Sequence, residues 1–171
     1  MRIDVSTWQD FLIKDYFKGE NTGNILARDI IDGSGDTPFV TASGINNGVV
    51  ALIDASKYNI IKGNCILIGG KTFTLTYQKL DFVSNDSHNI VIRTKEDALS
   101  ENVYLFLVTA LKASLSFRYS WGDAVTKDKL LENYIKLPAT SDGKPDWKYM
   151  ESFMTAVGKT VNESLNLVLS L

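Results

Sequence analysis

The alternation of apolar and polar residues predicts a succession of short strands in the first half of the chain. Short runs separated by turns rich in Gly, Asn and Ser indicate strands at 38–41, 49–53, 64–68, 72–77 and 89–93. The run at 64–68 is continuously apolar, which predicts a buried strand, and the run at 72–77 alternates with period two. Nearer the N-terminus, Thr7 is followed by an acid three positions later, which resembles a capping box. This pattern predicts a short helix that carries Trp8, Phe11 and Leu12.

From residue 100 onward the apolar period becomes that of helices. Ser100 fits the N-cap of a helix that runs to about Phe117 with one apolar face. Another apolar segment spans 130–137 and ends at Pro138. A last helix starts near Pro145, with an acid in its first turn. Its apolar residues recur at steps of three and four: Met150, Met154, Val157, Val161, Leu165, Val168 and Leu171.

This last helix is too long for the domain that precedes it. About 25 residues span about 37 Å, more than the core of so small a domain covers. An apolar stripe that continues to the last residue needs another helix to pack on. We therefore expect the helix to project and pair; the alternative is a helix folded back on its own domain.

Composition narrows the possible functions. The 171 residues are 44% hydrophobic and 22% charged, which is typical of a globular protein, and no apolar run reaches the roughly 20 residues that span a bilayer. The first residues lack the apolar core of a secretory signal. With one cysteine, Cys65, and one histidine, His88, the chain has little material for a disulfide, a zinc site or His-dependent catalysis. A cytoplasmic protein without enzymatic activity, cofactor or metal is expected.

The distribution of charge is compatible with nucleic-acid binding. The net charge is −2, but the stretch 57–79 holds four lysines and no acid, and 112–136 holds five cations against three acids. Lysines on an ordinary solvated surface would give the same pattern. Charge therefore permits DNA binding without demonstrating it.

The strings that look catalytic fail on inspection. Gly69–Thr72 lacks the first glycine of a phosphate-binding loop, because Cys65 stands there, and a strand pattern follows instead of a helix. Asp86, Ser87 and His88 are adjacent in sequence, whereas a catalytic triad is assembled from distant segments. We interpret His88 as a turn residue and Cys65 as a core residue.

Polar loops offer groups that read DNA. The stretch 41–48 contains two hydroxyls and two amides between strands, and 77–79 and 118–120 place aromatic residues beside donors. Asn can pair with an adenine edge, Ser and Thr with any base or phosphate, and Lys or Arg with guanine or phosphate. By chemistry alone, ordinary turn residues are the simpler interpretation.

A resemblance to a known family favours DNA contact over ordinary turn residues. Taken in order, 37–49, 63–70, 77–83, 135–138 and 143–147 resemble one half of a specificity subunit of type I restriction–modification systems. The most specific part is Leu137-Pro138 ahead of the Gly-Lys-Pro-Asp-Trp helix start at 143–147. The resemblance extends from Phe17 to the C-terminal helix.

The resemblance implies an α/β (α+β) target recognition domain at 1–140, followed by a spacer helix at 145–171. It implies double-stranded DNA, a methyltransferase subunit and, through it, a nuclease subunit as partners. Family subunits carry two such domains and two antiparallel helices, whereas this sequence has one of each. It therefore resembles a half subunit, and a homodimer through a helix–helix coiled coil is expected. Recognition subunits of some type II systems are similar.

These inferences define two candidate sites. The residues expected to contact DNA are Thr41, Ser43, Asn46, Asn47, Lys71, Thr72, Tyr77, Gln78, Lys79, Arg118 and Tyr119. The residues expected to form the dimer are Met154, Val157, Val161, Leu165 and Val168. The alternative function is a structural or regulatory homodimer whose globular domain binds protein or a small ligand.

Overall fold

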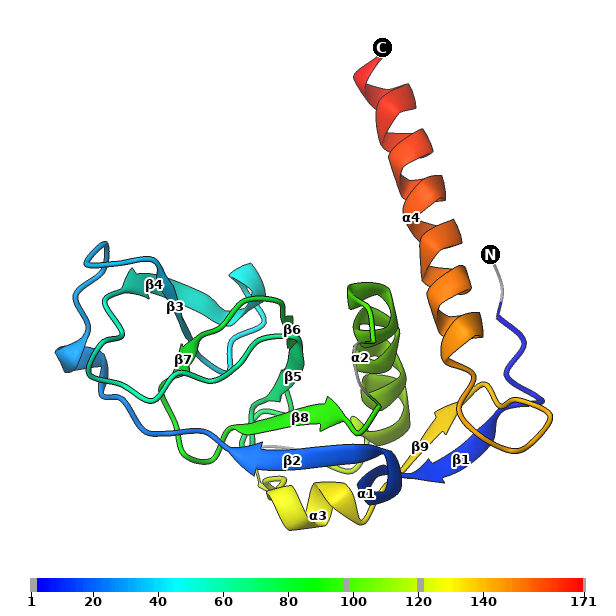
Figure 1. Ribbon diagram of the computed structural model, residues 1–171, viewed down its shortest axis with the longest axis horizontal. Coiled ribbons are helices and arrows are strands. Elements are labelled where there is room, and N and C mark those ends of the chain that lie inside the picture. The colour runs from blue at the N-terminus through cyan, green and yellow to red at the C-terminus, as the bar shows by residue number, and fades with distance from the viewer. Residues whose placement is uncertain (1–2, 97–98, 120–121, 171) are drawn as a thin grey trace.

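The computed structural model describes residues 3–96, 99–119 and 122–170, and its elements form an α/β globule from which one long helix projects (Figure 1). The central antiparallel sheet has the order β2 (Phe17–Asn21), β8 (Ile90–Thr94), β5 (Cys65–Ile68) and β6 (Leu75–Gln78). A second sheet has the order β4 (Val49–Ile53), β3 (Thr37–Val40) and β7 (Val83–Ser84), and a third pairs β1 (Gln9–Leu12) with β9 (Tyr134–Leu137). The helices are α1 (Ile13–Tyr16), α2 (Glu101–Leu115), α3 (Lys127–Leu131) and α4 (Trp147–Leu169), with 3-10 turns η1 (Ala27–Asp29) and η2 (Asn46–Gly48).

The inner strands β5 and β8 of the central sheet are buried on both faces, whereas the edge strand β2 is largely exposed. All four residues of β5 are buried, as the continuous apolar run predicts. Because side chains alternate along a strand, Ile66 and Ile68 join the main core with α2, while Cys65 and Leu67 join a second cluster on the opposite face. The central sheet therefore separates α2 on one face from the β4–β3–β7 sheet on the other.

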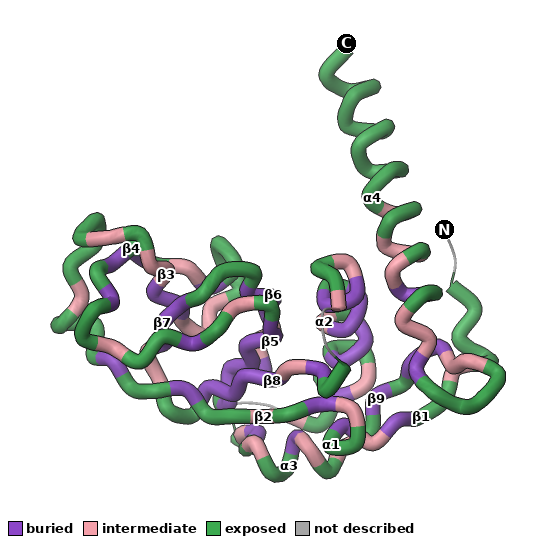
Figure 2. Tube along the Cα trace, in the orientation of Figure 1, coloured by how far each residue is buried: buried purple, intermediate pink, exposed green. Residues whose placement is uncertain are grey.

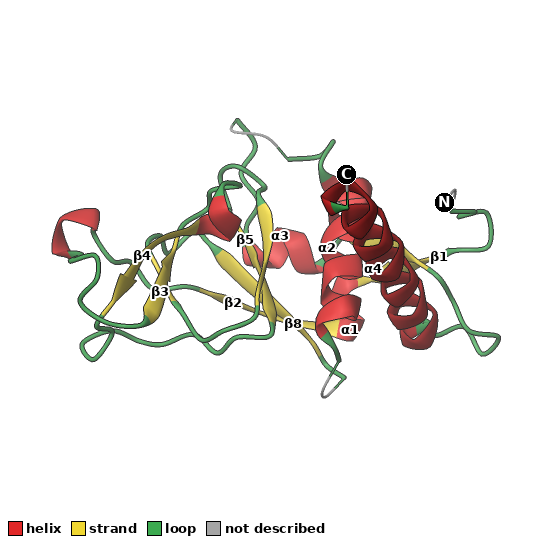
Figure 3. Cartoon of the chain, turned by 90° about the horizontal axis from the view of Figure 1, so that it is seen from above, coloured by secondary structure: helices red, strands yellow, loops and turns green. Residues whose placement is uncertain are grey.

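Helix α2 lies between the central sheet and α4 (Figures 1 and 3). It begins where expected, at the N-cap Ser100, whose side chain accepts a hydrogen bond from the Val103 amide. One face of α2 is buried in the main core, including Leu107 and Leu111, both fully inaccessible. This packing gives α4 a fixed base.

The predicted helix at Trp8 is wrong. The segment forms β1, antiparallel to β9, with Phe11 opposite Ile135, and both side chains are buried. The Trp8 ring packs on Phe106 of α2, 5.5 Å between centroids. A strand partner more than a hundred residues away along the chain overrides a local capping pattern, which by itself stabilises a helix only weakly.

Two other segments differ in detail from the sequence pattern. The apolar stretch 130–137 is divided between the end of α3 and strand β9. The alternating stretch 72–77 becomes a strand only at Leu75, because Phe73 has a left-handed φ of 50° and its amide bonds back to the Gly69 carbonyl at 2.8 Å. A tight turn therefore occupies 69–74.

Helix α4 projects from the domain, and Figure 2 shows its outer part exposed along its length. Its N-cap is Asp146, which accepts from the Tyr149 amide at 2.9 Å, so Pro145 precedes the cap instead of lying in the first turn. Met150 is fully buried in the main core, and Phe153 and Met154 pack against it. The base of α4 therefore belongs to the globule.

Candidate nucleic-acid interface

The loop 41–48 adopts a backbone that ordinary residues avoid. Asn46, Asn47 and Gly48 have positive φ angles of 49°, 51° and 81°. Asparagine tolerates this region better than most residues, and at Gly48 a side chain is impossible, because a Cβ would lie 2.6 Å from the Thr41 carbonyl oxygen. The Gly–Ile–Asn–Asn–Gly run therefore specifies one tight shape.

Amide side chains fasten this loop to β6. The Asn47 Nδ2 donates to the Tyr77 carbonyl oxygen at 2.7 Å, and the Gln78 Nε2 donates to the Asn47 carbonyl oxygen at 2.9 Å and to the Thr76 Oγ1 at 2.9 Å. Within the loop, Asn46 Nδ2 donates to the Val49 carbonyl oxygen at 2.9 Å. The loop is held in place before any ligand arrives.

Tyr77 and Gln78, both predicted to contact DNA, are buried in the structure. The Tyr77 hydroxyl donates to Asn64 Oδ1 at 3.0 Å, its ring stacks on Tyr104 at 5.5 Å, and burial raises the pKa of its phenol. The Gln78 carboxamide is engaged as described above. The Gln78 side chain therefore supports the loop, and the Tyr77 side chain is engaged with Asn64 and Tyr104 inside the domain.

The predicted residues Thr41 and Ser43 also serve the loop. The Thr41 amide donates to the Gly48 carbonyl at 2.9 Å, which closes the loop, and the Ser43 Oγ accepts from the Ile45 amide at 3.1 Å. Both are half-buried, whereas Asn46 is exposed. The polar composition that suggested DNA contact thus builds the loop itself.

A cleft of about 610 Å³ brings three elements together: the 41–48 loop, the 69–74 turn and the C-terminal end of α2. Three predicted residues line it, namely Asn47, Thr72 and Tyr119. The other polar residues of the cleft were not among the predicted contacts; they are Thr74, Thr76, Lys112 and Ser116. Lys112 and Ser116 are four residues apart and outside the apolar face of α2, so helical spacing was the signal that could have found them.

The cations divide into paired and unpaired groups. Lys71 forms a salt bridge with Asp86 at 3.1 Å, and Lys79 forms one with Glu101 at 2.8 Å. The two ion pairs lie in different parts of the fold. Lys112 and Arg118 have no carboxylate within 4.0 Å among residues 3–96, 99–119 and 122–170; the Arg118 guanidinium lies 5.4 Å from the Phe117 ring centre. Among the described cations without a carboxylate partner, Lys112 lines the cleft and Arg118 follows the C-terminal end of α2 in the chain.

The cysteine and the histidine considered for catalysis occupy structural positions in the described part of the chain. Cys65 is fully buried, and burial raises the pKa of its thiol to about 12. His88 occupies a turn, as expected, with its amide bonded to Asp86. No group of three metal-ligating side chains occurs there, and no described helix has the length and apolar character that a bilayer requires.

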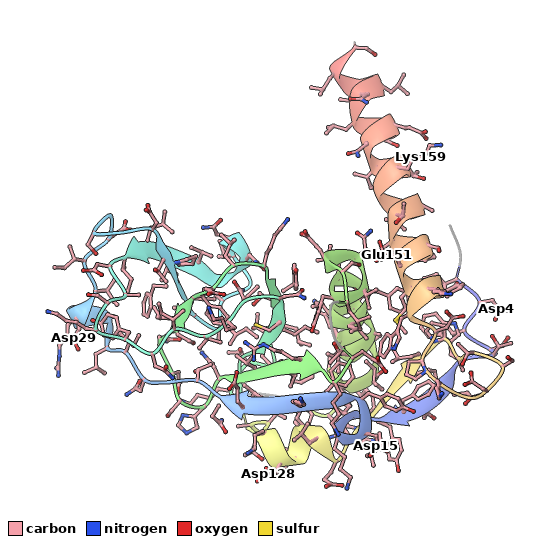
Figure 4. All side chains as sticks on the ribbon, in the orientation of Figure 1. Asp4, Asp15, Asp29, Asp128, Glu151 and Lys159 are labelled. Carbon is pink, nitrogen blue, oxygen red and sulfur yellow. The ribbon has the colours of Figure 1, made fainter. Side chains whose placement is uncertain are left out.

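The apolar stripe of α4 is continuous with its buried base. Residues 150, 154, 157, 161, 165 and 168 share one helical face, and along it burial decreases from fully buried Met150 to Val161 and Leu165, which are 58% and 53% exposed. Figure 4 shows Glu151 at the base beside α2 and Lys159 farther out on the projecting part. In the described chain nothing covers the outer stripe.

Known proteins share this sequence and this fold. The specificity subunit S.BcgI of a type II restriction enzyme from Heyndrickxia coagulans is 27% identical over 169 residues, covering 94% of this chain and 46% of that protein, so the chain spans about half the length of this curated relative. Among solved structures, the type I restriction–modification S subunit from M. genitalium has a TM-score of 0.65 at 8% identity. This match covers 96% of the present chain and 42% of the M. genitalium chain. The HsdS subunit from Thermoanaerobacter tengcongensis has a TM-score of 0.62 at 13% identity. This match covers 92% of the present chain and 39% of the HsdS chain.

These structural similarities confirm the expected fold, a mixed α/β globule followed by a long C-terminal helix. The family model of the type I restriction modification DNA specificity domain matches residues 5–167, which include the loop, the cleft and most of α4. The chain therefore belongs to the type I restriction modification DNA specificity domain family.

Proposed function

We propose that this chain is a sequence-reading half subunit that binds one half of a split DNA site and directs a methyltransferase, and through it a nuclease, to that site. The observation that carries the proposal is the family match over residues 5–167, which includes both the cleft and the projecting helix. The resemblance to specificity subunits supports the methyltransferase and nuclease as partners.

DNA binds at the cleft between the 41–48 loop and the end of α2. Thr72, Thr74 and Ser116 offer hydroxyls there, and Lys112 offers an ammonium. Hydroxyls bond base edges or phosphates, and an unpaired lysine attracts phosphate without first giving up a carboxylate. Arg118, beside the cleft, adds a second free cation. Lys71 and Lys79 contribute less, because each must leave an ion pair to reach DNA.

The outer part of α4 forms a dimer with the same helix of a second copy. The face that packs into the globule at Met150 continues outward through Met154 and Val157 to Val161, Leu165 and Val168. A second, antiparallel α4 would cover this stripe by a two-fold contact. Two identical recognition domains then face two identical half-sites, so the preferred site is an interrupted palindrome.

Methyl transfer belongs to the partner subunit in this proposal. The three prolines of the sequence are isolated from one another, so no Asn-Pro-Pro-Tyr motif is present. The one thiol is buried and the one histidine lies in a surface turn. These features support a reader that recruits catalysis.

The test is binding of the full chain to labelled mixed-sequence duplex across a salt series. We expect log Kd to change linearly with log salt concentration, because phosphate contacts release counterions. Selection of bound oligonucleotides from a random pool, with the modification subunit present, should then return an interrupted palindrome. Absence of affinity for any duplex at low salt would contradict DNA binding and favour the structural homodimer.

A further inference from the structure

Ile45 is the most exposed large apolar side chain in the described structure, at 81%. Single exposed apolar residues are common on protein surfaces and need no explanation by themselves. Ile45 differs from such residues because hydrogen bonds hold its backbone in one position. Its amide donates to Ser43 Oγ at 3.1 Å, and its carbonyl accepts from the Gly48 amide at 2.9 Å. Both of its main-chain polar groups are therefore used to hold it in place.

The rest of the loop fixes the direction in which Ile45 is presented. The two residues that follow it have left-handed backbones, and Asn47 is bonded to β6 by its side chain and by its carbonyl group. Isoleucine is also stiff, since its branched Cβ restricts χ1. A rigid loop thus carries a rigid apolar side chain into solvent.

Ile45 borders the cleft proposed to hold DNA. Gly44 and Asn47, on either side of it, line that cleft together with Thr72, Thr74 and Lys112. Its chain neighbours Gly44 and Asn46 bring no apolar side chain, so the loop tip offers one apolar group among polar ones. A protein interface core would instead require a contiguous apolar patch.

We propose that Ile45 contacts the C5 methyl group of a thymine in the major groove and is a specificity-determining residue for the target site. The base edges of the major groove present donors and acceptors, and the thymine methyl is their distinct apolar group. One rigid apolar side chain beside hydroxyls and a lysine matches that arrangement. The inference rests on the proposed DNA-reading function and adds a named contact to it.

The test compares thymine with uracil, which lacks the methyl group. Full-length wild type and Ile45→Ala are each used to select duplexes from a random pool, and the selected site is then resynthesised with uracil at one thymine at a time. For wild type, we expect one substitution to weaken binding about fourfold, the equivalent of one buried methyl group. Ile45→Ala should bind the thymine and uracil duplexes equally at that position.

A matched variant controls for the removal of an exposed isoleucine. Ile31 is 73% exposed, follows η1 and does not line the cleft, so Ile31→Ala should keep the wild-type thymine preference. The inference is overturned if Ile45→Ala keeps that preference, or if wild type ignores every thymine-to-uracil change. It is also overturned if Ile45→Ala leaves DNA binding intact but weakens capture of the methyltransferase subunit. A wild-type chain that selects no sequence at all would instead refute the proposed function.

Discussion

Gln78 and Asn47 join two parts of the fold through a reciprocal pair of hydrogen bonds. The Gln78 carboxamide donates to the Asn47 carbonyl at 2.9 Å, while the Asn47 carboxamide donates to the carbonyl of Tyr77, the neighbour of Gln78, at 2.7 Å. The Gln78 side chain is buried, whereas Asn47 is exposed and lines the cleft, so the two bonds lie at the boundary between the domain core and the cleft. The shape of the 41–48 loop therefore depends on a residue outside it.

Replacing Gln78 by Ala should destabilise the chain by about 1–3 kcal/mol, because the carbonyl of Asn47 would be left without its buried donor. Urea unfolding measures the change in stability, and hydrogen exchange should show reduced protection at 41–48. The other glutamine, Gln9, is exposed on β1, and Gln9→Ala is the matched control with little expected effect. Unchanged exchange in the loop of Gln78→Ala would contradict the positioning role.

Lys112→Ala should weaken binding to all duplexes and reduce the salt slope by about one unit, as expected when one phosphate is no longer neutralised. Arg118→Ala should act in the same direction, and Lys71→Ala and Lys79→Ala should have smaller effects because both lysines are ion-paired. Binding isotherms at several salt concentrations measure these changes. Lys159→Ala, on the projecting helix, is the control. Equal effects of Lys159 and Lys112 would place the DNA elsewhere.

Changes at the exposed amide Asn46, and at Asn47 or Thr72 in the cleft, should alter preference between sequences, by about 1–3 kcal/mol for each base that is no longer recognised. Asn47 also supports the loop, so Asn47→Ala combines a structural effect with a recognition effect. Thr72→Val keeps the side-chain shape and removes the hydroxyl, which also accepts a hydrogen bond from the Thr74 Oγ1 at 2.9 Å, so hydrogen exchange at 69–74 is measured with it to detect any loosening of the turn. Sequence selection with each variant gives the readout. A selected site identical to that of wild type for Thr72→Val would remove Thr72 from the reader.

Val161→Asp combined with Leu165→Asp should abolish self-association and leave the globule folded, because both side chains are exposed in the single chain. Sedimentation at micromolar concentration measures the oligomeric state, and circular dichroism checks folding. Ala156→Asp with Asn166→Asp charges the opposite side of α4 and should keep the dimer. A wild-type monomer at that concentration would contradict pairing through α4.

Low pH should remove stability supplied by Asp86. Burial favours its neutral form, but hydrogen bonds from His88 and Lys71 outweigh this and lower its pKa from 3.8 to about 2. Its carboxylate therefore stabilises the native state above about pH 4, by about 2 kcal/mol, and the contribution disappears as the pH falls through 2. Unfolding at pH 5 and below pH 3, compared with Asp86→Asn, tests this; an equal pH dependence in the variant would contradict it.

The isolated chain should transfer no methyl group. Incubation with labelled S-adenosylmethionine and mixed-sequence DNA should give background incorporation, and addition of the modification subunit should raise it. Reproducible incorporation by the chain alone would contradict the assignment of catalysis to the partner.

The sequence by itself determined the elements whose signals are local and strong. Three local patterns placed an element correctly: the apolar run of β5, the Ser100 cap of α2 and the three–four spacing of α4. They did so because burial and helical period determine which positions along the chain are apolar. The length and the apolar spacing of α4 also indicated that its outer part would project from the domain.

Only the tertiary structure decided which polar residues line the cleft and which are buried. Tyr77 and Gln78 have the chemistry of DNA contacts, but β6 packs beside α2 and the loop, which buries both. Lys112 and Ser116 reach the cleft because α2 crosses near the 69–74 turn. Gln9–Leu12, next to Trp8, formed a strand because 134–137 offered a partner. Each outcome depends on pairing between residues far apart in the chain, and local sequence patterns do not encode such pairing.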